Sequence, residues 1–371
     1  MAGLAVDVFG GFEVANPLED PGWDRKMAAH PEATVFHSAG WAGVLADTYG
    51  FRPTYLTRMR EGHRPTLLAL MEIRGILGRR RGVSLPFTDN CPILLPEGED
   101  ETGLVDRFLK PGDTASCLAT LDPLLEAARA LARQRSWQNI EFRPKPPAAS
   151  VGSGSIVFAS HEVPLLGSDA EQERQCEPAM RRSLRQAQTA ALPVRIGGEL
   201  SLVQAYYRLH CLTRRRQGAP PQPWRFFANL HKMLISQGLG FVVVVGDSPI
   251  AGAVFLRFGT RAVYKFGASD GRLLETRPNQ RVMWAGLRHA AGLGGQWMDL
   301  GRTSIANEGL RRFKRGWGSV ETRLMYHQID LKRNRQNVMS DHTRGLQAVF
   351  LKLLPVCLTR WVGELAYRFA A

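Results

Sequence analysis

Cysteine is scarce in this chain, and the few cysteines are poorly placed for joint chemistry. The five (Cys91, Cys117, Cys176, Cys211 and Cys357) are odd in number, far apart and free of any CxxC or Cys/His spacing. That pattern argues against a disulfide framework and against a zinc site. It fits a reducing compartment, so we expect a cytoplasmic protein.

A signal peptide and long uninterrupted apolar runs are also missing. The first residues show no basic segment followed by an apolar core, so export is not expected. The most apolar stretch, residues 346–371, is interrupted by a proline and by charged side chains that are costly in a bilayer. Its charged and apolar residues form separate helical stripes. We predict an amphipathic helix that packs against the first domain; peripheral contact with the inner membrane face is the alternative.

The chain is long, has a high apolar content and carries a net positive charge. Its 371 residues exceed what one hydrophobic core usually serves, so two domains are expected. A composition of 44% hydrophobic and 22% charged residues excludes a disordered or collagen-like chain. The 48 Lys and Arg against 34 Asp and Glu give a net charge of +14, which favours an anionic partner. No helix-turn-helix or zinc-finger pattern accompanies this charge, so DNA is not the expected partner.

Periodicity predicts strands and helices in the same order in both halves, with a Pro-, Gly- and Ser-rich connection at 146–155. The elements predicted in the first half are a helix over 37–50, a hairpin over 51–75, a helix over 118–134 and a strand over 139–146. Those predicted in the second half are helices over 179–191, 202–216 and 224–236, a hairpin over 241–259, a strand over 262–269, a helix over 279–291, a strand over 296–301 and a short helix from about 308. This order indicates a mixed α/β protein built from two similar parts.

The segment with the most chemistry is residues 299–318, DLGRTSIANEGLRRFKRGWG. It places five cations among glycines and two aromatic residues: Arg302, Arg311, Arg312, Lys314 and Arg315. One interpretation is a solvated basic turn. The other is a turn that presents backbone N–H groups and cations to a phosphate.

This segment resembles the FemAB-like branch of the GNAT superfamily. The run NEGLRRFKRGWG, with GRTSI before it and YKFGASD earlier, is similar to the end of the catalytic domain in that family. RRSLRQA near 181, YYRLHCLTRRRQGAPPQP near 206 and HSAGWAGVLADTYG near 37 agree with it. The chain looks most similar to FemAB-related proteins of bacterial exosortase and exopolysaccharide systems.

The resemblance implies two tandem GNAT-like domains, each a mixed, mainly antiparallel sheet flanked by helices. The implied extents are an N-terminal domain at 1–150, a catalytic domain at 151–328 and a segment at 329–371 that returns to the first domain. The family resemblance also implies an acyltransferase that moves an amino acid from aminoacyl-tRNA to an amine of a peptidoglycan or exopolysaccharide precursor. That acceptor is an anionic saccharide or peptide, lipid-linked in some relatives.

Direct amine attack on an ester or thioester needs no protein nucleophile, but it needs positive charge where the carbonyl oxygen becomes negative. By motif match, the resemblance assigns that charge to Lys314, with Phe313 beside it. It also implies that Arg311, Arg312 and Arg315 lie where a polyanionic donor is held.

Acidic and aromatic candidates accompany these cations. Asp299, at a strand end, is the preferred positioning group, although it could instead pair with Arg302. Asp270 is a second carboxylate that is expected near the substrate cleft of the catalytic domain. Tyr264 and Lys265 alternate on one strand, so only one of them should face that cleft.

Two further basic clusters are predicted on helices. Arg181, Arg182 and Arg185 form one cluster, and Arg214, Arg215 and Arg216 form the other. They could position tRNA or a pyrophosphoryl substrate without reading its sequence. Arginines at the C-terminal end of a helix also stabilise the helix dipole regardless of function.

The sequence indicates a donor co-substrate and neither a resident cofactor nor a metal. The stretch DGRLLETRP stands where acyl-CoA-dependent GNAT enzymes carry a Q/RxxGxG/A pyrophosphate loop. Aminoacyl-tRNA is therefore the first candidate donor, and acyl-CoA with an amino-sugar acceptor is the second. A third hypothesis is an inactive adaptor that binds tRNA or polysaccharide.

Overall fold

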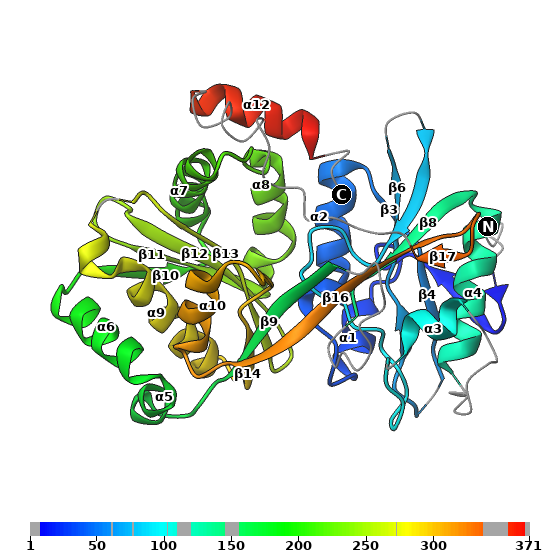
Figure 1. The fold of residues 1–371 in the computed structure, drawn as a ribbon, viewed down its shortest axis with the longest axis horizontal. Coiled ribbons are helices and arrows are strands. Elements are labelled where there is room, and N and C mark those ends of the chain that lie inside the picture. The colour runs from blue at the N-terminus through cyan, green and yellow to red at the C-terminus, as the bar shows by residue number, and fades with distance from the viewer. Residues whose placement is uncertain are drawn as a thin grey trace. The chain divides into compact units, whose positions relative to one another are not determined.

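The chain folds as two compact units (Figure 1). The computed structural model describes residues 8–60, 62–75, 78–101, 103–109, 120–144, 156–271, 273–336 and 355–367. Unit 1 contains the described residues up to 158 and those of 322–336, whereas unit 2 contains 159–321 and 355–367. Strands β9 (Ile156–Pro164) and β16 (Val320–Asp330) pass from one unit to the other. The connection predicted at 146–155 lies outside the described residues.

Unit 1 contains two sheets. The first is antiparallel with the order β1-β2-β4-β5, and the second has the order β16-β8-β7-β6-β3, in which β7 and β8 run parallel. The bounds are β1 Val8–Phe9, β2 Phe12–Ala15, β3 Arg52–Pro53, β4 Tyr55–Arg58, β5 Thr66–Leu68, β6 Met71–Arg74, β7 Arg80–Val83, β8 Trp137–Phe142 and β17 Arg335–Gln336, which pairs with β16. The predicted hairpin is confirmed as the antiparallel pair β4 and β5, and the strand predicted at 139–146 is β8.

The helices of unit 1 begin and end at signals that the sequence shows. Their bounds are α1 Trp23–Ala28, α2 Ala39–Tyr49, α3 Leu104–Leu109 and α4 Leu121–Gln134. Ser38 Oγ accepts a hydrogen bond from the Trp41 N–H at the start of α2, and Gly50 ends it with a left-handed φ of 74°. Pro123 lies in the first turn of α4, where a missing N–H costs little. Both helices predicted in this half are confirmed.

Unit 2 is built on a sheet with the order β10-β11-β12-β13-β14-β9. Only β13 and β14 among these pairs run parallel, and helix α9 connects them. The strand bounds are β10 Val194–Gly197, β11 Gly240–Val245, β12 Ala251–Phe258, β13 Arg261–Ser269, β14 Trp297–Asp299 and β15 Thr303–Ser304. The helix bounds are α5 Asp169–Gln175, α6 Pro178–Thr189, α7 Leu200–Gln217, α8 Trp224–Met233, α9 Pro278–Gly292 and α10 Glu308–Arg315. The predicted hairpin, helices and strands are confirmed, and so is the mixed, mainly antiparallel α/β class.

Strand β13 contains a bulge and extends beyond its parallel neighbour. Phe255 pairs with Tyr264 and Val254 pairs with Phe266, so Lys265 is the extra residue. Pairing with β14 ends at Val263 opposite Asp299, whereas β13 continues to Ser269. The two strands are therefore joined at one end only.

The last described helix, α12 (Val356–Ala366), packs on α7 of unit 2. Arg214 Nη2 donates to the Tyr367 hydroxyl oxygen at 3.0 Å, and that hydroxyl donates to the Pro220 carbonyl at 3.1 Å. The Arg360 guanidinium lies over the Tyr207 ring at 5.3 Å. Residues 322–336 lie in unit 1, but α12 does not, so the prediction that the tail helix packs on the first domain is wrong. Within the described residues, every helix is too short or too polar to cross a membrane.

Candidate active site in unit 2

Lys314 is a buried lysine held at the end of β14. Its Nζ donates to the Gly301 carbonyl at 2.7 Å and to the Arg302 carbonyl at 3.2 Å, and the residue is only 3% exposed. Asp299 Oδ1 accepts a hydrogen bond from the Gly301 N–H at 2.7 Å, and Gly301 takes a φ of +76°. This turn directs two carbonyl oxygens at the ammonium group. The result is a positive charge fixed in a low-dielectric environment.

Helix α10 positions this lysine. The Asn307 side chain accepts from the Leu310 N–H, which caps the helix at its start. Phe313 is half-buried, and its ring packs edge to face on the Trp317 ring, with the two ring centres 6.1 Å apart. Tyr264 of β13 packs against the same apolar cluster as Phe313. The structure thus places Lys314 and Asp299 at the Gly301 turn, and it packs Phe313 and Tyr264 against the apolar core of unit 2.

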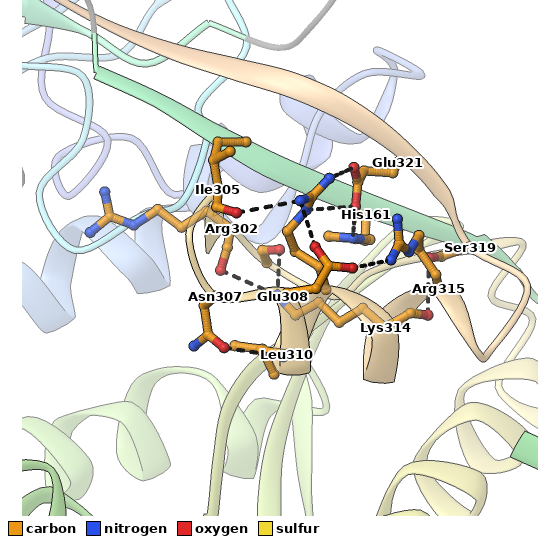
Figure 2. A network of polar contacts seen from close by, with 12 residues as sticks. His161, Arg302, Ile305, Asn307, Glu308, Leu310, Lys314, Arg315, Ser319 and Glu321 are labelled. Carbon is orange, nitrogen blue, oxygen red and sulfur yellow. Dashed lines mark hydrogen bonds and ion pairs between the residues drawn. The ribbon is translucent and has the colours of Figure 1, made fainter.

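The basic run on α10 is largely neutralised by carboxylates of unit 2, as Figure 2 shows. Arg311 Nη2 lies 2.6 Å from Glu321 Oε1, and Arg311 Nη1 lies 2.9 Å from Glu308 Oε2. Arg315 pairs with Glu308 as well. The hydrogen bond from Arg311 holds the pKa of the Glu321 carboxyl below its ordinary value. Arg311 and Arg315 are therefore engaged within the protein, whereas Arg302 and Arg312 are exposed.

Glu321 also holds a histidine that the sequence did not indicate. His161 Nε2 lies 2.9 Å from Glu321 Oε2, and the His161 side chain is fully buried. Burial first, and then the charge of Lys314, lower the pKa of His161 to about 4, so the ring is neutral at pH 7. In the tautomer that donates from Nε2, Nδ1 carries the lone pair and has no hydrogen-bond partner among the described residues.

Sequence reasoning missed His161 and Glu321 because no spacing connects them to the motif. His161 stands on β9, and Glu321 stands on β16, 160 residues away. Only the folded sheet places the two strands beside α10. A single histidine in a strand gives no usable signal of its own.

The candidates on β13 occupy different surroundings. Tyr264 is half-buried, and burial raises the pKa of its phenol to about 12. The Lys265 ammonium lies over the Phe266 ring at 5.3 Å. Because Lys265 is the bulge residue, simple alternation of the two side chains does not hold here. Asp270 follows the strand, next to the point where Arg216 Nη2 donates to the Ser269 carbonyl at 3.0 Å.

The two predicted arginine clusters are divided by the fold. Arg214 binds α12, Arg216 binds the end of β13, and Arg215 is half-buried between them in sequence. On α6, Arg181 is half-buried and Arg182 is exposed. Arg185, with 71% of its side chain exposed, pairs loosely with Glu173 at 3.4 Å. The α7 arginines are therefore held at separate points, whereas Arg182 and Arg185 of α6 are both exposed.

A metal site is not among the features that the described chain forms. No three His, Cys, Asp or Glu side chains in those residues gather closely enough to hold an ion. The candidate site combines a buried ammonium, a neutral histidine and a set of arginine–carboxylate pairs.

Known proteins share this fold. Residues 174–315 match the family model described as acetyltransferase (GNAT) domain. The crystal structure of FemX is similar over 82% of this chain and 94% of FemX, with 14% identity and a TM-score of 0.63. A conserved protein of unknown function from Bacteroides thetaiotaomicron is similar over 85% of this chain and 98% of its own, with 9% identity and a TM-score of 0.52. No curated protein matches. The matched domain ends with α10 and includes Lys314.

Proposed function

We propose that this chain is an acyltransferase of the FemAB-like GNAT type and that it transfers an aminoacyl group from aminoacyl-tRNA to an amine. The GNAT-domain match over residues 174–315 and the fold shared with FemX support this proposal. The proposed acceptor is an anionic saccharide or peptide precursor of the cell envelope. The observation that carries this proposal is the buried ammonium of Lys314 at the end of β14. A fixed charge in a low-dielectric site stabilises a developing oxyanion without reorganisation during the reaction.

The proposed reaction is a direct displacement at the acyl carbonyl. The acceptor nitrogen forms a bond to the carbonyl carbon, and the oxygen gains negative charge that Lys314 stabilises. The bond from carbon to the donor oxygen then breaks. The proton that the nitrogen loses ends on that leaving oxygen, so the reaction needs no redox partner and no enzyme nucleophile.

Four residues of the candidate site are assigned supporting roles. Asp299 fixes the Gly301 turn through its 2.7 Å hydrogen bond, and this turn sets the position of the ammonium. Phe313 and Tyr264 contribute apolar surface that excludes water from the charge. Neutral His161 avoids a second positive charge beside Lys314.

The exposed cations are proposed to hold the polyanionic donor. Arg302 and Arg312, together with Arg182 and Arg185 on α6, are exposed residues. Arg311 and Arg315 are assigned to shaping α10, because Glu308 and Glu321 already neutralise them. The donor contacts proposed for α10 are therefore fewer than its sequence suggests.

Aminoacyl-tRNA is preferred over acyl-CoA because the segment between β13 and α9, DGRLLETRP, does not carry the glycine-rich pyrophosphate loop of acyl-CoA-dependent GNAT enzymes. The segment between β13 and α9 holds Leu273 and Arg277 in the left-handed region, at φ values of 53° and 55°. The Arg277 Nε atom donates to Gln186 Oε1 at 3.1 Å, which ties that guanidinium to α6. Acyl-CoA with an amino-sugar acceptor is the second candidate, and it is supported by the acetyltransferase domain match.

We also propose a cytoplasmic protein whose helix α12 makes peripheral contact with the inner membrane face. Leu358 is 47% exposed and Trp361 is 61% exposed, three residues apart on the same helix. Arg360 lies between them in sequence. An apolar face with an aromatic side chain and a nearby cation is typical of helices that lie on anionic membranes.

A donor competition tests the proposed function. The full chain is incubated with radiolabelled aminoacyl-tRNA or radiolabelled acetyl-CoA, and with UDP-N-acetylmuramoyl-pentapeptide or glucosamine as acceptor. We expect alkali-stable label, the mark of an amide, on the peptide precursor from aminoacyl-tRNA. Label from acetyl-CoA on glucosamine would favour the second candidate. Bound tRNA without any transfer would favour an inactive adaptor, and either result would contradict the proposal.

A further inference from the structure

Unit 1 has a cavity of its own, which is lined by none of the candidate active-site residues. Its volume is about 380 Å³, which is within the range of small-molecule sites. Its walls are the end of β4, described residues of the loop that follows β4, the turn at 96–99 and the residue before α4. The polar side chains that line it include Arg58, Arg60, Arg64, Glu99 and Thr120.

Arg58 is held in place inside this cavity. Its Nη2 donates to Thr120 Oγ1 at 3.0 Å, and its guanidinium lies 4.5 Å from the centre of the buried Phe12 ring. Thr120 precedes α4, whose N-terminal N–H groups have no side-chain cap there. Burial first, and then the charge of Arg60, lower the pKa of Arg58. A fixed arginine in this position favours an anion beside it.

Arg60 and Arg64 also line this cavity, and neither forms a strong ion pair with the described residues. The Arg64 Nη2 atom is 4.0 Å from Glu97 Oε2, and these side chains are 41% and 84% exposed. A pair at that distance and exposure contributes little to stability. Arg60 is exposed and forms no ion pair with the residues that the structure describes. Their charges therefore remain available to a ligand.

Glu99 adds an acceptor to this basic cavity. Its Oε2 atom is buried and accepts no hydrogen bond from the described part of the chain. A buried carboxylate oxygen without a donor is costly, so a ligand that brings an O–H group would stabilise the site. The cavity is therefore complementary to a small molecule that carries both an anionic group and a hydroxyl group.

We propose that this cavity binds a phosphorylated saccharide. Arg60 and Arg64 hold the phosphate beside Arg58, and a sugar hydroxyl donates to Glu99 Oε2. Three guanidinium groups exceed the need of a single carboxylate, whereas a phosphate dianion matches them. This site lies in unit 1 and stands whether or not unit 2 catalyses aminoacyl transfer.

Calorimetric titration of the full chain tests the site. The probes are glucose 6-phosphate and N-acetylglucosamine 1-phosphate, with inorganic phosphate and glucose as partial ligands. We expect at least one sugar phosphate to bind about tenfold more tightly than inorganic phosphate, because the Glu99 hydrogen bond adds about 1.5 kcal/mol. Failure of both sugar phosphates to bind, or binding no tighter than inorganic phosphate, would overturn the proposal.

Variants identify the cavity as the binding site. Arg60→Ala should weaken sugar-phosphate binding about tenfold or more through loss of a charge-assisted contact. Glu99→Gln should narrow the preference for the sugar phosphate over inorganic phosphate. Arg74→Ala removes an exposed arginine of β6 outside the cavity and should leave binding unchanged. Because Arg60 forms no ion pair with the described residues, its variant should keep the wild-type unfolding midpoint. Equal weakening by Arg74→Ala would count against the site.

Discussion

Two arginine groups in this protein illustrate the difference between basic sequence and available charge. On α10, the run from Arg311 to Arg315 is dense in cations, yet Glu308 and Glu321 bind its two half-buried arginines. In the unit 1 cavity, the arginines are spread along a loop, and the pair from Arg64 to Glu97 is long and exposed. The arginines of α10 therefore stabilise their own helix, whereas those of the unit 1 cavity are available to a ligand. The positions of the carboxylates in the folded chain decide between these two roles.

The largest effect on the α10 side of this comparison should come from Glu321. Glu321→Ala leaves Arg311 without its closest partner and His161 without its hydrogen bond, so we expect a loss of about 1–3 kcal/mol in the free energy of unfolding. Urea denaturation measures this loss. Glu308→Ala is the matched control, since its pairs are more exposed and should cost under about 1 kcal/mol. Equal losses for the two variants would show that Glu321 has no special place in the cluster.

The pH dependence of the unfolding free energy tests the surroundings of His161 in the α10 cluster. The pKa of His161 is about 4 when folded and about 6.5 when unfolded, so the unfolded chain binds more protons between these values. Stability must therefore fall as pH falls from about 6.5 towards 4, and level off for this group below that. His37, with a folded pKa of about 4, and His210, with one of about 3, act in the same direction.

The contribution of His161 can be isolated by substitution. His161→Gln should reduce the slope of the unfolding free energy against pH by nearly one proton in this window. Unfolding midpoints between pH 4.5 and pH 7, which span roughly that window, measure the slope. An unchanged slope would mean that His161 is not held neutral by its surroundings. Glu321 has a lowered folded pKa, so its own stabilisation is lost only at still lower pH, as pH falls through that value.

The smallest predicted effect concerns α12. Trp361→Ala should weaken sedimentation with phosphatidylglycerol vesicles about fivefold, because the change removes part of an exposed apolar face. The matched control is Leu212→Ala on α7, an exposed leucine outside α12. An equal loss in both variants would show that α12 is not the specific membrane contact. Binding that salt reduces and Trp361→Ala does not would make the contact electrostatic.

The sequence predicts what is local and misses what is assembled from distant strands. Ser38 and Gly50 mark the ends of α2 by their own chemistry, and the two β-branched runs around residue 247 can only form a hairpin. The bulge at Lys265 and the pairing of His161 with Glu321 depend on strand register, which no local pattern shows. The partner of α12 was predicted wrongly because an amphipathic stripe indicates that a face is buried, and not which surface covers it.

The roles predicted for the site residues stay predictions, but the structure shows the surroundings of each side chain. Lys314 was identified by its position after Phe313, and the structure buries it against the Gly301 turn. Arg311 and Arg315 were predicted to hold a donor, but both form ion pairs with carboxylates of the protein. The sequence shows which residues are charged, and the fold determines which charges have partners within the protein.

The most direct test of this account is the rate of acyl transfer by Lys314→Met, compared with Lys232→Met, which removes an exposed lysine of α8. Both proteins are first shown to be folded at the assay temperature by their unfolding midpoints. The account predicts that Lys314→Met lowers kcat by about 100-fold or more, and that Lys232→Met changes it little. A folded Lys314→Met protein that keeps kcat within about threefold of the wild type would contradict the assignment of Lys314 to the developing oxyanion.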